Sequence, residues 1–268
     1  MQLACLDGLV GPAAGATIAV TDDGLLRGDG AFEVMRLYDG RAFALEDHLV
    51  RLGRSAENLR LPLDIDAVRA DVHAILEAAP AEARDGCLRV VLTRGGRRLL
   101  LTEPLPPAAP TIRLAAVTYA PTRILDQVKS LSYAGNMLAS RIAHERGAGE
   151  ALLVTPHGRV LEAPTSSFFW VREGKLLTPP LSEHILASIT RDRVLEETGA
   201  GEAECTLDDV RTADEAFLAS TTREVQPVAA VDDAELPAAP GPVTERAAAA
   251  LRARIEAELG VAASAAAR

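Results

Sequence analysis

Apolar and polar residues follow one another in the N-terminal part of the chain in patterns typical of an α+β domain. Residues 31–45 have strand composition on both sides of the turn signal Asp39-Gly40, which predicts a β-hairpin. Apolar residues at helical spacing from about Glu46 predict a helix that Pro62 ends. The other elements expected here are a helix over 66–79 and buried strands over 87–94 and 111–117, the strands joined by a loop rich in Arg, Leu and Pro.

A break in this pattern indicates a second domain. Between residues 118 and 127 the periodicity is lost and Pro121 interrupts the chain, so we expect a small N-terminal domain over 1–117, a linker over 118–127 and a larger domain over 128–268. The elements expected in the larger domain are helices over 136–146, 188–198 and 244–259, hairpins around His157-Gly158 and Glu173-Gly174, a strand over 215–221, and a tail, 261–268, that frays.

Composition and charge narrow the classes of protein. The 268 residues include 38 acidic and 28 basic ones, and a net charge of -10 would repel a phosphate backbone, so we expect no nucleic acid partner. The chain has neither a secretory leader pattern nor a long apolar run, which favours a cytoplasmic protein with no membrane partner. Cys5, Cys87 and Cys205 are odd in number and lack metal-site spacing, which favours reduced thiols and no metal site.

Lysine is the scarcest basic residue, and this restricts one kind of chemistry to two positions. Only Lys129 and Lys175 occur among the 28 basic residues, and the other 26 are arginines. Arginine stays protonated, whereas lysine can lose its proton and attack a carbonyl to form an imine. Lys129 stands where an apolar run turns into a helix, and partial burial there would favour the uncharged amine. Lys175 lies in a hairpin turn and is expected to be solvated; the alternative is that both are ordinary surface lysines.

Polar residues at the ends of other elements are candidates to bind charged groups. Glu162 ends an apolar strand beside a run of hydroxyl residues, where its carboxylate could pair with a buried cation or could be a plain surface acid. Ser188 and Thr190 open a helix whose free N–H groups suit an anion such as phosphate, with a simple N-cap as the alternative. The hydroxyls of 220–222 and the guanidinium of Arg51 could contribute to the same anion site.

The order of these motifs resembles that of the class IV aminotransferases, the fold type IV family of pyridoxal 5′-phosphate enzymes. The resemblance covers nearly the whole chain and implies a homodimer of two-lobe α+β subunits, each with a small N-terminal α/β lobe and a larger C-terminal lobe that has a mixed barrel-like sheet and binds the cofactor. It rests on seven stretches: GDGAFEVMRLYDG (28–40), HLVRL (48–52), VLTRGG (91–96), VKSLSYAGNMLA (128–139), EALLVTPHGRVLEAPTSSFF (150–169), ILASITRD (185–192) and FLASTTREVQPV (217–228).

The resemblance also implies roles for individual residues. Lys129 matches the lysine that holds the cofactor as a Schiff base and shuttles protons, and Glu162 matches the partner of the pyridine nitrogen. The other matching positions are phosphate-binding (Arg51, Ile189, Thr190 and Thr221), packed against the cofactor ring (Leu186) or an aromatic wall of the substrate pocket (Phe32).

Two positions depart from the family pattern. After the glutamate the family usually has Gly and then Ser or Thr, whereas this chain has Ala163-Pro164, and proline has no N–H to donate. Ser167 replaces the usual asparagine before the aromatic strand, which shortens the reach of that side chain. We therefore expect the cofactor site to be kept, with altered hydrogen bonding around it.

The resemblance allows more than one reaction. The family includes aminotransferases for branched-chain L-amino acids, D-amino acids and (R)-amines, and also aminodeoxychorismate lyase. KSLSYAGN and EVMRLYDG resemble the aminotransferases somewhat more, so we expect amino transfer between an amino acid of the branched-chain L- or D-type and a 2-oxo acid. The alternatives are the lyase, which releases pyruvate and 4-aminobenzoate, a cofactor-free binding protein on the same fold, and a lysine-based aldolase.

Three arginines are candidates to bind the substrate. Arg94, Arg97 and Arg98 follow the strand over 87–94, where some relatives place substrate-binding arginines. A guanidinium could hold the substrate carboxylate in a bidentate manner. The alternative is that Arg97 and Arg98 are solvated loop charges.

Overall fold

A computed structural model describes residues 1–260, which form two compact units. The first unit comprises Met1–Pro107, Val128–Tyr133 and 257–260, and the second comprises Ala108–Gln127 and Ala134–Glu256. These bounds differ from the domains expected over 1–117 and 128–268, because the strand after residue 111 joins the sheet of the second unit and the Lys129 segment pairs with a strand of the first. That 1–117 and 128–268 fold as domains stays a prediction, and the tail, 261–268, lies outside the described residues.

An antiparallel six-stranded sheet with the order β2-β1-β6-β5-β3-β4 forms the first unit. The hairpin expected over 31–45 is confirmed as β3 and β4, and the backbone of Asp39 (φ 48°) and Gly40 (φ 77°) is left-handed at its turn. The elements are β1 (Leu3–Leu6), β2 (Leu9–Pro12), η1 (Ala13–Gly15), α1 (Asp23–Arg27), β3 (Gly30–Tyr38), β4 (Arg41–Ala42), α2 (Leu45–Leu59), α3 (Ile65–Ala78), η2 (Ala81–Ala83), β5 (Cys87–Thr93) and β6 (Arg98–Glu103).

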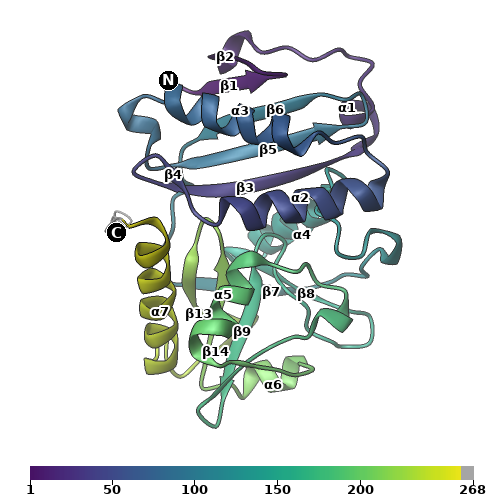
Figure 1. The fold of residues 1–268 in the computed structure, drawn as a ribbon. Coiled ribbons are helices and arrows are strands. Elements are labelled where there is room, and N and C mark those ends of the chain that lie inside the picture. The colour runs from purple at the N-terminus through teal and green to yellow at the C-terminus, as the bar shows by residue number, and fades with distance from the viewer. Residues whose placement is uncertain (261–268) are drawn as a thin grey trace. The chain divides into compact units, whose positions relative to one another are not determined.

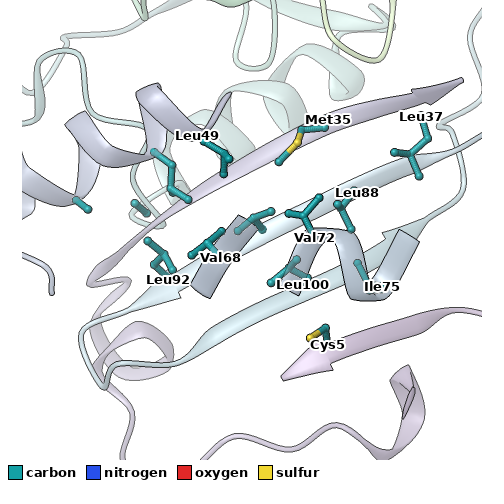
Figure 2. Packing of buried hydrophobic residues seen from close by; sticks show 14 of the residues in the cluster. Cys5, Met35, Leu37, Leu49, Val68, Val72, Ile75, Leu88, Leu92 and Leu100 are labelled. Atoms are coloured by element: carbon teal, nitrogen blue, oxygen red, sulfur yellow. The ribbon is translucent and has the colours of Figure 1, made fainter. Parts of the chain in front are cut away.

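Helices α2 and α3 pack against one face of this sheet (Figure 1). Leu49 of α2 and Val72 of α3 meet Met35 and Leu88 of the strands in one buried cluster (Figure 2). Alternate strand residues face the helices, and both helices present apolar residues at helical spacing, so burial of this face holds the unit together.

The connection predicted between the strands over 87–94 and 111–117 is not a plain loop. It contains β6, which pairs with β5 on one side and with β1 on the other. The sequence of β6 has three leucines in succession, Leu99–Leu101, so it lacks the alternation that marks a half-buried strand.

The second unit contains a mixed eight-stranded sheet with the order β11-β10-β9-β12-β13-β7-β8, and β14 pairs with β13. Parallel pairs join β7 to β8 and β13, and β10 to β11, whereas the remaining pairs are antiparallel. The elements are β7 (Ile112–Thr118), η3 (Arg123–Leu125), α4 (Ala134–Glu145), β8 (Glu150–Val154), β9 (Ser167–Arg172), β10 (Lys175–Thr178), η4 (Leu181–Glu183), α5 (Ile189–Thr198), β11 (Gly201–Glu202), α6 (Leu207–Arg211), β12 (Glu215–Ser220), β13 (Glu224–Val231), β14 (Ala234–Glu235) and α7 (Pro242–Leu259).

The predicted helices and most predicted strands of this part are confirmed, and so is the α+β fold class. The strand expected after Gly158 is wrong as a regular strand. Isolated bridges join Val160 to Val154 and Arg159 to Thr206, and the Val160 N–H donates to the Cys205 carbonyl (2.8 Å), so this stretch divides its pairing between two partners.

Two further observations bear on the class of protein. Within residues 1–260 no helix is both long enough and apolar enough to cross a membrane. Cys5, Cys87 and Cys205 are free, buried thiols, and burial raises the pKa of each, that of Cys87 to about 11. Such thiols are poor nucleophiles at neutral pH.

Candidate active site

Lys129 lies in an extended segment that pairs with the start of β3. The Phe32 N–H donates to the Lys129 carbonyl (3.0 Å), and the Leu131 N–H donates to the Gly30 carbonyl (2.9 Å). Position 30 requires glycine, because a Cβ there would lie 2.2 Å from the Leu92 carbonyl oxygen of β5. The antiparallel register therefore sets the Lys129 side chain directly across from that of Phe32.

Two aromatic rings lie near the amine of Lys129. Its Nζ lies 4.4 Å from the centroid of the Phe32 ring and 5.9 Å from that of Tyr133, and the two rings meet edge to face. The backbone N–H of Lys129 donates to the buried Ser55 Oγ of α2 (3.1 Å). Lys129 is half-buried and Lys175 is exposed, so the environments expected of the two lysines are confirmed.

A buried ion pair joins β3 to α2 on the opposite face of β3 from Phe32. Arg51 donates from Nε to Glu33 Oε1 (2.8 Å) and from Nη2 to Glu33 Oε2 (2.6 Å). His48, one turn earlier on α2, places Nδ1 2.8 Å from Glu33 Oε2. All three side chains are almost completely buried. Glu33 thus holds the guanidinium of Arg51, which is expected to bind the phosphate.

The charges of this cluster are set by burial and by its ion pairs. Burial alone would raise the pKa of Glu33, but the charge of Arg51 and the hydrogen bonds from Arg51 and His48 outweigh it and lower that pKa to about 2. Burial lowers the pKa of His48, against the hydrogen bond and charge of Glu33, and the cations of Arg51 and Lys129 lower it further. His48 is therefore neutral at pH 7, and Glu33 and Arg51 are charged.

In the second unit, Glu162 ends a segment that follows β8 in the chain and pairs back with it. Its N-terminal neighbour pairs with β8, and the Leu153 N–H donates to the Glu162 carbonyl (2.9 Å). The side chain of Glu162 accepts, through Oε1, the N–H of Leu186 (3.1 Å). Burial raises the pKa of Tyr119, and the negative charge of Glu162 adds to that rise. The structure thus brings Glu162 together with Leu186, the residue expected to pack against the cofactor ring.

The helix expected to bind phosphate is α5. Ser188 is its N-cap and accepts the Arg191 N–H (3.3 Å), so the simple N-cap that the sequence left open is present. Ile189 and Thr190 form the buried first turn, where the N–H groups of the helix start are located. Thr221 lies in the turn after β12, a strand that packs against α5. These positions can offer several N–H and hydroxyl groups to an anion.

The Ala163-Pro164 departure forms a tight turn. The N–H of Ala163 donates to the Ser166 carbonyl (2.8 Å), and the Ser166 N–H donates back to the Ala163 carbonyl (3.3 Å). Pro164 uses its carbonyl, which accepts Asn136 Nδ2 (3.0 Å). The hydroxyls of Ser166 and Ser167 are buried and have no hydrogen-bond partner in the part of the chain that the structure describes. The turn therefore leaves two buried hydroxyls close in sequence to Glu162.

A second polar cluster, which the sequence did not indicate, supports this region. Glu150 of β8 accepts Ser140 Oγ (2.6 Å), Thr165 Oγ1 (3.4 Å) and Arg223 Nη2 (3.0 Å). Thr165 belongs to the turn after Glu162, and Arg223 follows Thr221 by two residues. One buried carboxylate therefore links the two loops that carry the expected ring and phosphate ligands.

Arg94 is held by the first unit itself. Its Nε and Nη2 donate to the two carboxylate oxygens of Asp29 (2.9 and 3.2 Å). Its Nη groups also donate to the carbonyls of Leu59 and Arg60 at the C-terminal end of α2 (2.6 and 2.5 Å). A cation there satisfies carbonyl groups that the helix leaves open.

Arg97 and Arg98 also have acidic partners. Arg97 pairs with Asp7 (2.7 Å) and is exposed, with 46% of its side chain accessible, whereas Arg98 pairs with Asp71 (2.8 Å) and is more buried. Both arginines line a cavity of about 450 Å³. Lys129 is not among the residues that line it. A substrate-binding role for these arginines stays a prediction.

The predicted site residues divide between the two units. The site residues of the second unit lie in the loops that follow β8 and β12 and around the start of α5. Those of the first unit lie near the start of β3 or follow β5. The first set is Phe32, Arg51, Arg94, Arg97, Arg98 and Lys129, and the second is Glu162, Leu186, Ile189, Thr190 and Thr221.

Comparison with known proteins decides the family. The sequence matches the family described as amino-transferase class IV over residues 30–231. This chain belongs to the class IV aminotransferases. The expected resemblance is thereby confirmed, as is the two-lobe fold of type IV.

Two relatives illustrate the range of this class IV family. A protein of Methanocaldococcus jannaschii that is assigned as a branched-chain-amino-acid aminotransferase is 36% identical over 242 residues, which cover 81% of this chain and 83% of that protein. The D-alanine aminotransferase of Bacillus licheniformis is 32% identical over 252 residues, which cover 85% and 88%.

Solved structures give the same result. The fold IV-transaminase CpuTA1 from Curtobacterium pusillum superposes with a TM-score of 0.86 at 29% identity, covering 96% of this chain and 99% of that one. A hypothetical aminotransferase from Mycobacterium tuberculosis, in its PLP-bound form, has a TM-score of 0.86 at 27% identity with the same coverage. The 4-amino-4-deoxychorismate lyase from Pseudomonas aeruginosa has a TM-score of 0.81 at 29% identity, also with the same coverage.

This class IV aminotransferase is a pyridoxal 5′-phosphate enzyme, and its residues fit that cofactor. Taken one by one, the residues expected to bind it offer suitable groups: Lys129 an amine for an aldehyde, Glu162 a carboxylate for a ring nitrogen, and the start of α5 N–H groups for a phosphate. The two buried hydroxyls of Ser166 and Ser167 without partners among the described residues are groups that a polar ligand can satisfy.

Proposed function

We propose that this enzyme transfers an amino group between an amino acid of the branched-chain L- or D-type and a 2-oxo acid, with Lys129 as its catalytic residue. The observation that carries the proposal is the Lys129 amine, 4.4 Å from the Phe32 ring centroid in a half-buried aromatic corner. Low exposure favours the uncharged amine that nucleophilic attack on an aldehyde requires. Relatives named as branched-chain and D-alanine aminotransferases support the choice of substrate class.

We assign to Lys129 two tasks. Its amine would hold the cofactor through the aldehyde carbon until an incoming amino acid displaces it. Once displaced, the free amine would be the base of this chain that takes a proton from the substrate Cα and returns it to the former aldehyde carbon of the cofactor. The bound cofactor supplies an electron sink that stabilises negative charge at Cα. The Phe32 ring would shield one side of the amine from water.

The remaining cofactor ligands would act by charge and hydrogen bonding. Glu162, ionised and oriented by the Leu186 N–H, would keep a proton on the ring nitrogen. Leu186 would pack against the ring. The phosphate would be held by Arg51, whose plane is fixed by Glu33, and by Ile189, Thr190 and Thr221.

The substrate would lie against the Phe32 ring, which forms an apolar wall next to the amine. Among the candidate arginines, Arg97 is the one best suited to a substrate carboxylate, because it is the most exposed of the three. Arg94 and Arg98 remain candidates; all three guanidinium groups have an acidic partner, and these two are the less exposed.

The lyase is a second candidate, because a lyase structure superposes on nearly the whole chain. The test is a panel of L- and D-amino acids, each mixed with the holoenzyme and 2-oxoglutarate, with amino acid products measured by chromatography. Aminodeoxychorismate is the parallel substrate. Transfer from branched-chain or D-amino acids supports the proposal; release of pyruvate and 4-aminobenzoate without any amino transfer contradicts it.

A homodimer in the cytoplasm is the assembly and location that we propose. Family resemblance supports the dimer, and three buried free thiols are compatible with a reducing compartment. Light scattering coupled to gel filtration tests the dimer, which should give twice the mass of one chain, 28.3 kDa. A monomer that retains activity would contradict this part of the proposal.

A further inference from the structure

The segment that leads into α5 is held by side chains on both of its edges. On one edge, Gln127 Nε2 donates to the Ile185 carbonyl (3.0 Å) and Gln127 Oε1 accepts the Ala187 N–H (3.0 Å). On the other edge, Glu162 Oε1 accepts the Leu186 N–H (3.1 Å). Two side chains therefore bond three successive residues of this segment.

This arrangement has the hydrogen-bond geometry of a β-ladder. In extended backbone, the carbonyl of one residue and the N–H of the second residue after it point to the same side, and the residue between them points to the opposite side. The carboxamide of Gln127 offers one donor and one acceptor, as a peptide group would, and fills one side. The Leu186 N–H must then point to the other side, where Glu162 accepts it.

The backbone at Gln127 adapts to this contact. Its φ is +60°, in the left-handed region that residues other than glycine and asparagine seldom adopt. Such a conformation persists when the surrounding contacts determine it. The two hydrogen bonds of the Gln127 side chain are contacts of this kind.

We propose that Gln127 is a positioning residue for the cofactor ring: by bonding Ile185 and Ala187 it aims the Leu186 N–H at Glu162 and so fixes the carboxylate that faces the ring nitrogen. This inference rests on the proposed role of Glu162. Ser188, the N-cap of α5, follows Ala187 directly in the chain.

The variant that tests this inference is Gln127→Asn. Asparagine tolerates the left-handed backbone, so the fold of the segment is kept, but its shorter side chain cannot span both Ile185 and Ala187. We expect affinity for pyridoxal 5′-phosphate, measured by fluorescence titration of the apoprotein, to fall about tenfold, which corresponds to two ordinary hydrogen bonds. The pH titration of the visible absorption of the holoenzyme should shift in the same direction as in Glu162→Gln, by a smaller amount.

A double-mutant cycle separates this role from a loss of stability. In the Glu162→Gln background, Gln127→Asn should add no further shift of the absorption titration, because the carboxylate that it positions is gone. Gln127→Gly is the second variant if Gln127→Asn gives too little folded protein, since glycine also accepts the left-handed backbone.

His184→Asn is the matched control. His184 is also left-handed (φ 62°) and its Nδ1 contacts Asp126 (2.8 Å) in the same region, but it does not bond residues 185–187. We expect unchanged cofactor titration in this control. An equal shift in His184→Asn, or a full additional shift in the double variant, overturns the inference. If Glu162→Gln itself causes no shift, the proposed role of Glu162 fails instead.

Discussion

Glu33 of β3 and Arg51 of α2 form a two-point ion pair inside the first unit, with N–O distances of 2.8 and 2.6 Å. His48 completes the contacts of the carboxylate. Because the guanidinium is planar, two parallel bonds to one carboxylate fix both its position and its orientation. Arg51 is therefore pre-organised by the protein for the phosphate that we assign to it.

Removal of this carboxylate charge should destabilise the protein strongly. Glu33→Gln leaves the buried Arg51 cation with a neutral partner, and we expect the free energy of unfolding to fall by about 3 kcal/mol. Urea denaturation of the apoprotein measures it. Glu46→Gln is the control, because Glu46 pairs with Arg69 at the surface and its loss should have little effect. Equal changes in the two variants would contradict the prediction.

The same cluster predicts how stability depends on pH. The pKa of Glu33 is lowered from 4.5 to about 2, so its ionised form stabilises the fold fully above pH 4.5, and this contribution is lost as the pH falls towards 2. The pKa of His48 is lowered from 6.5, so the unfolded chain takes up its proton first and stability also declines as the pH falls below 6.5. Both groups therefore lower the free energy of unfolding as the pH falls.

Urea unfolding at a series of pH values checks this dependence. Glu33 should account for about 3 kcal/mol of the loss between roughly pH 5 and pH 2. Glu33→Gln should therefore show a flatter acid limb than the unmodified protein. An acid limb of unchanged slope in that variant would show that other groups cause the loss.

The sequence predicts those elements of the fold that depend on local signals. The ends of α2 and α5 are marked by Pro62 and Gly199, and both were placed to within a residue or two. β1 and β6 were missed, because each is short or lacks alternation and becomes a strand only by pairing with partners far away in the chain. Such pairing has no local pattern.

The candidate site shows the same division. Lys129 could be identified because only lysine forms imines and this chain has one other lysine. Glu33 and Arg36 are charged residues in a largely apolar strand, which suggests buried partners, but the partner of Glu33 becomes visible only when α2 packs on β3. No sequence pattern pointed to Gln127 or Glu150. Their contacts are with the backbone or with side chains of other elements, which only the fold brings near.

The two lysines provide a direct test of the cofactor linkage. Lys129→Ala should abolish the visible absorption of the bound cofactor and lower the transfer rate by roughly a thousandfold or more, because both the covalent linkage and the proton carrier are lost. Lys175→Ala removes an exposed lysine and should retain both properties. Borohydride reduction followed by peptide mass spectrometry should find the modified lysine at position 129. Modification at 175 with normal activity of Lys129→Ala would contradict the assignment.

Arg94 and Arg97 should respond differently to replacement. Arg94→Ala removes the guanidinium that bonds the last carbonyls of α2 and pairs with Asp29. We therefore expect the free energy of unfolding to fall by about 1–2 kcal/mol. Arg97→Ala removes an exposed side chain and should leave stability unchanged. If Arg97 binds the substrate carboxylate, its variant should raise the KM for the amino acid about tenfold with kcat nearly unchanged. An unchanged KM would show that Arg97 does not bind the substrate carboxylate.

Pro164 can be tested by restoring the residue type that the family usually has. Pro164→Ser keeps the carbonyl that accepts Asn136 Nδ2 and adds an N–H and a hydroxyl. A proline whose backbone suits a turn restricts the unfolded chain, so the variant should lose about 0.5–1 kcal/mol of stability. Cofactor affinity should stay within about twofold, because the carbonyl that accepts Asn136 Nδ2 is kept. Calorimetry of the apoprotein and fluorescence titration with pyridoxal 5′-phosphate measure the two effects. If the Pro164→Ser variant instead bound the cofactor more than tenfold tighter, the prediction would be contradicted. The N–H that proline lacks would then contribute to cofactor binding.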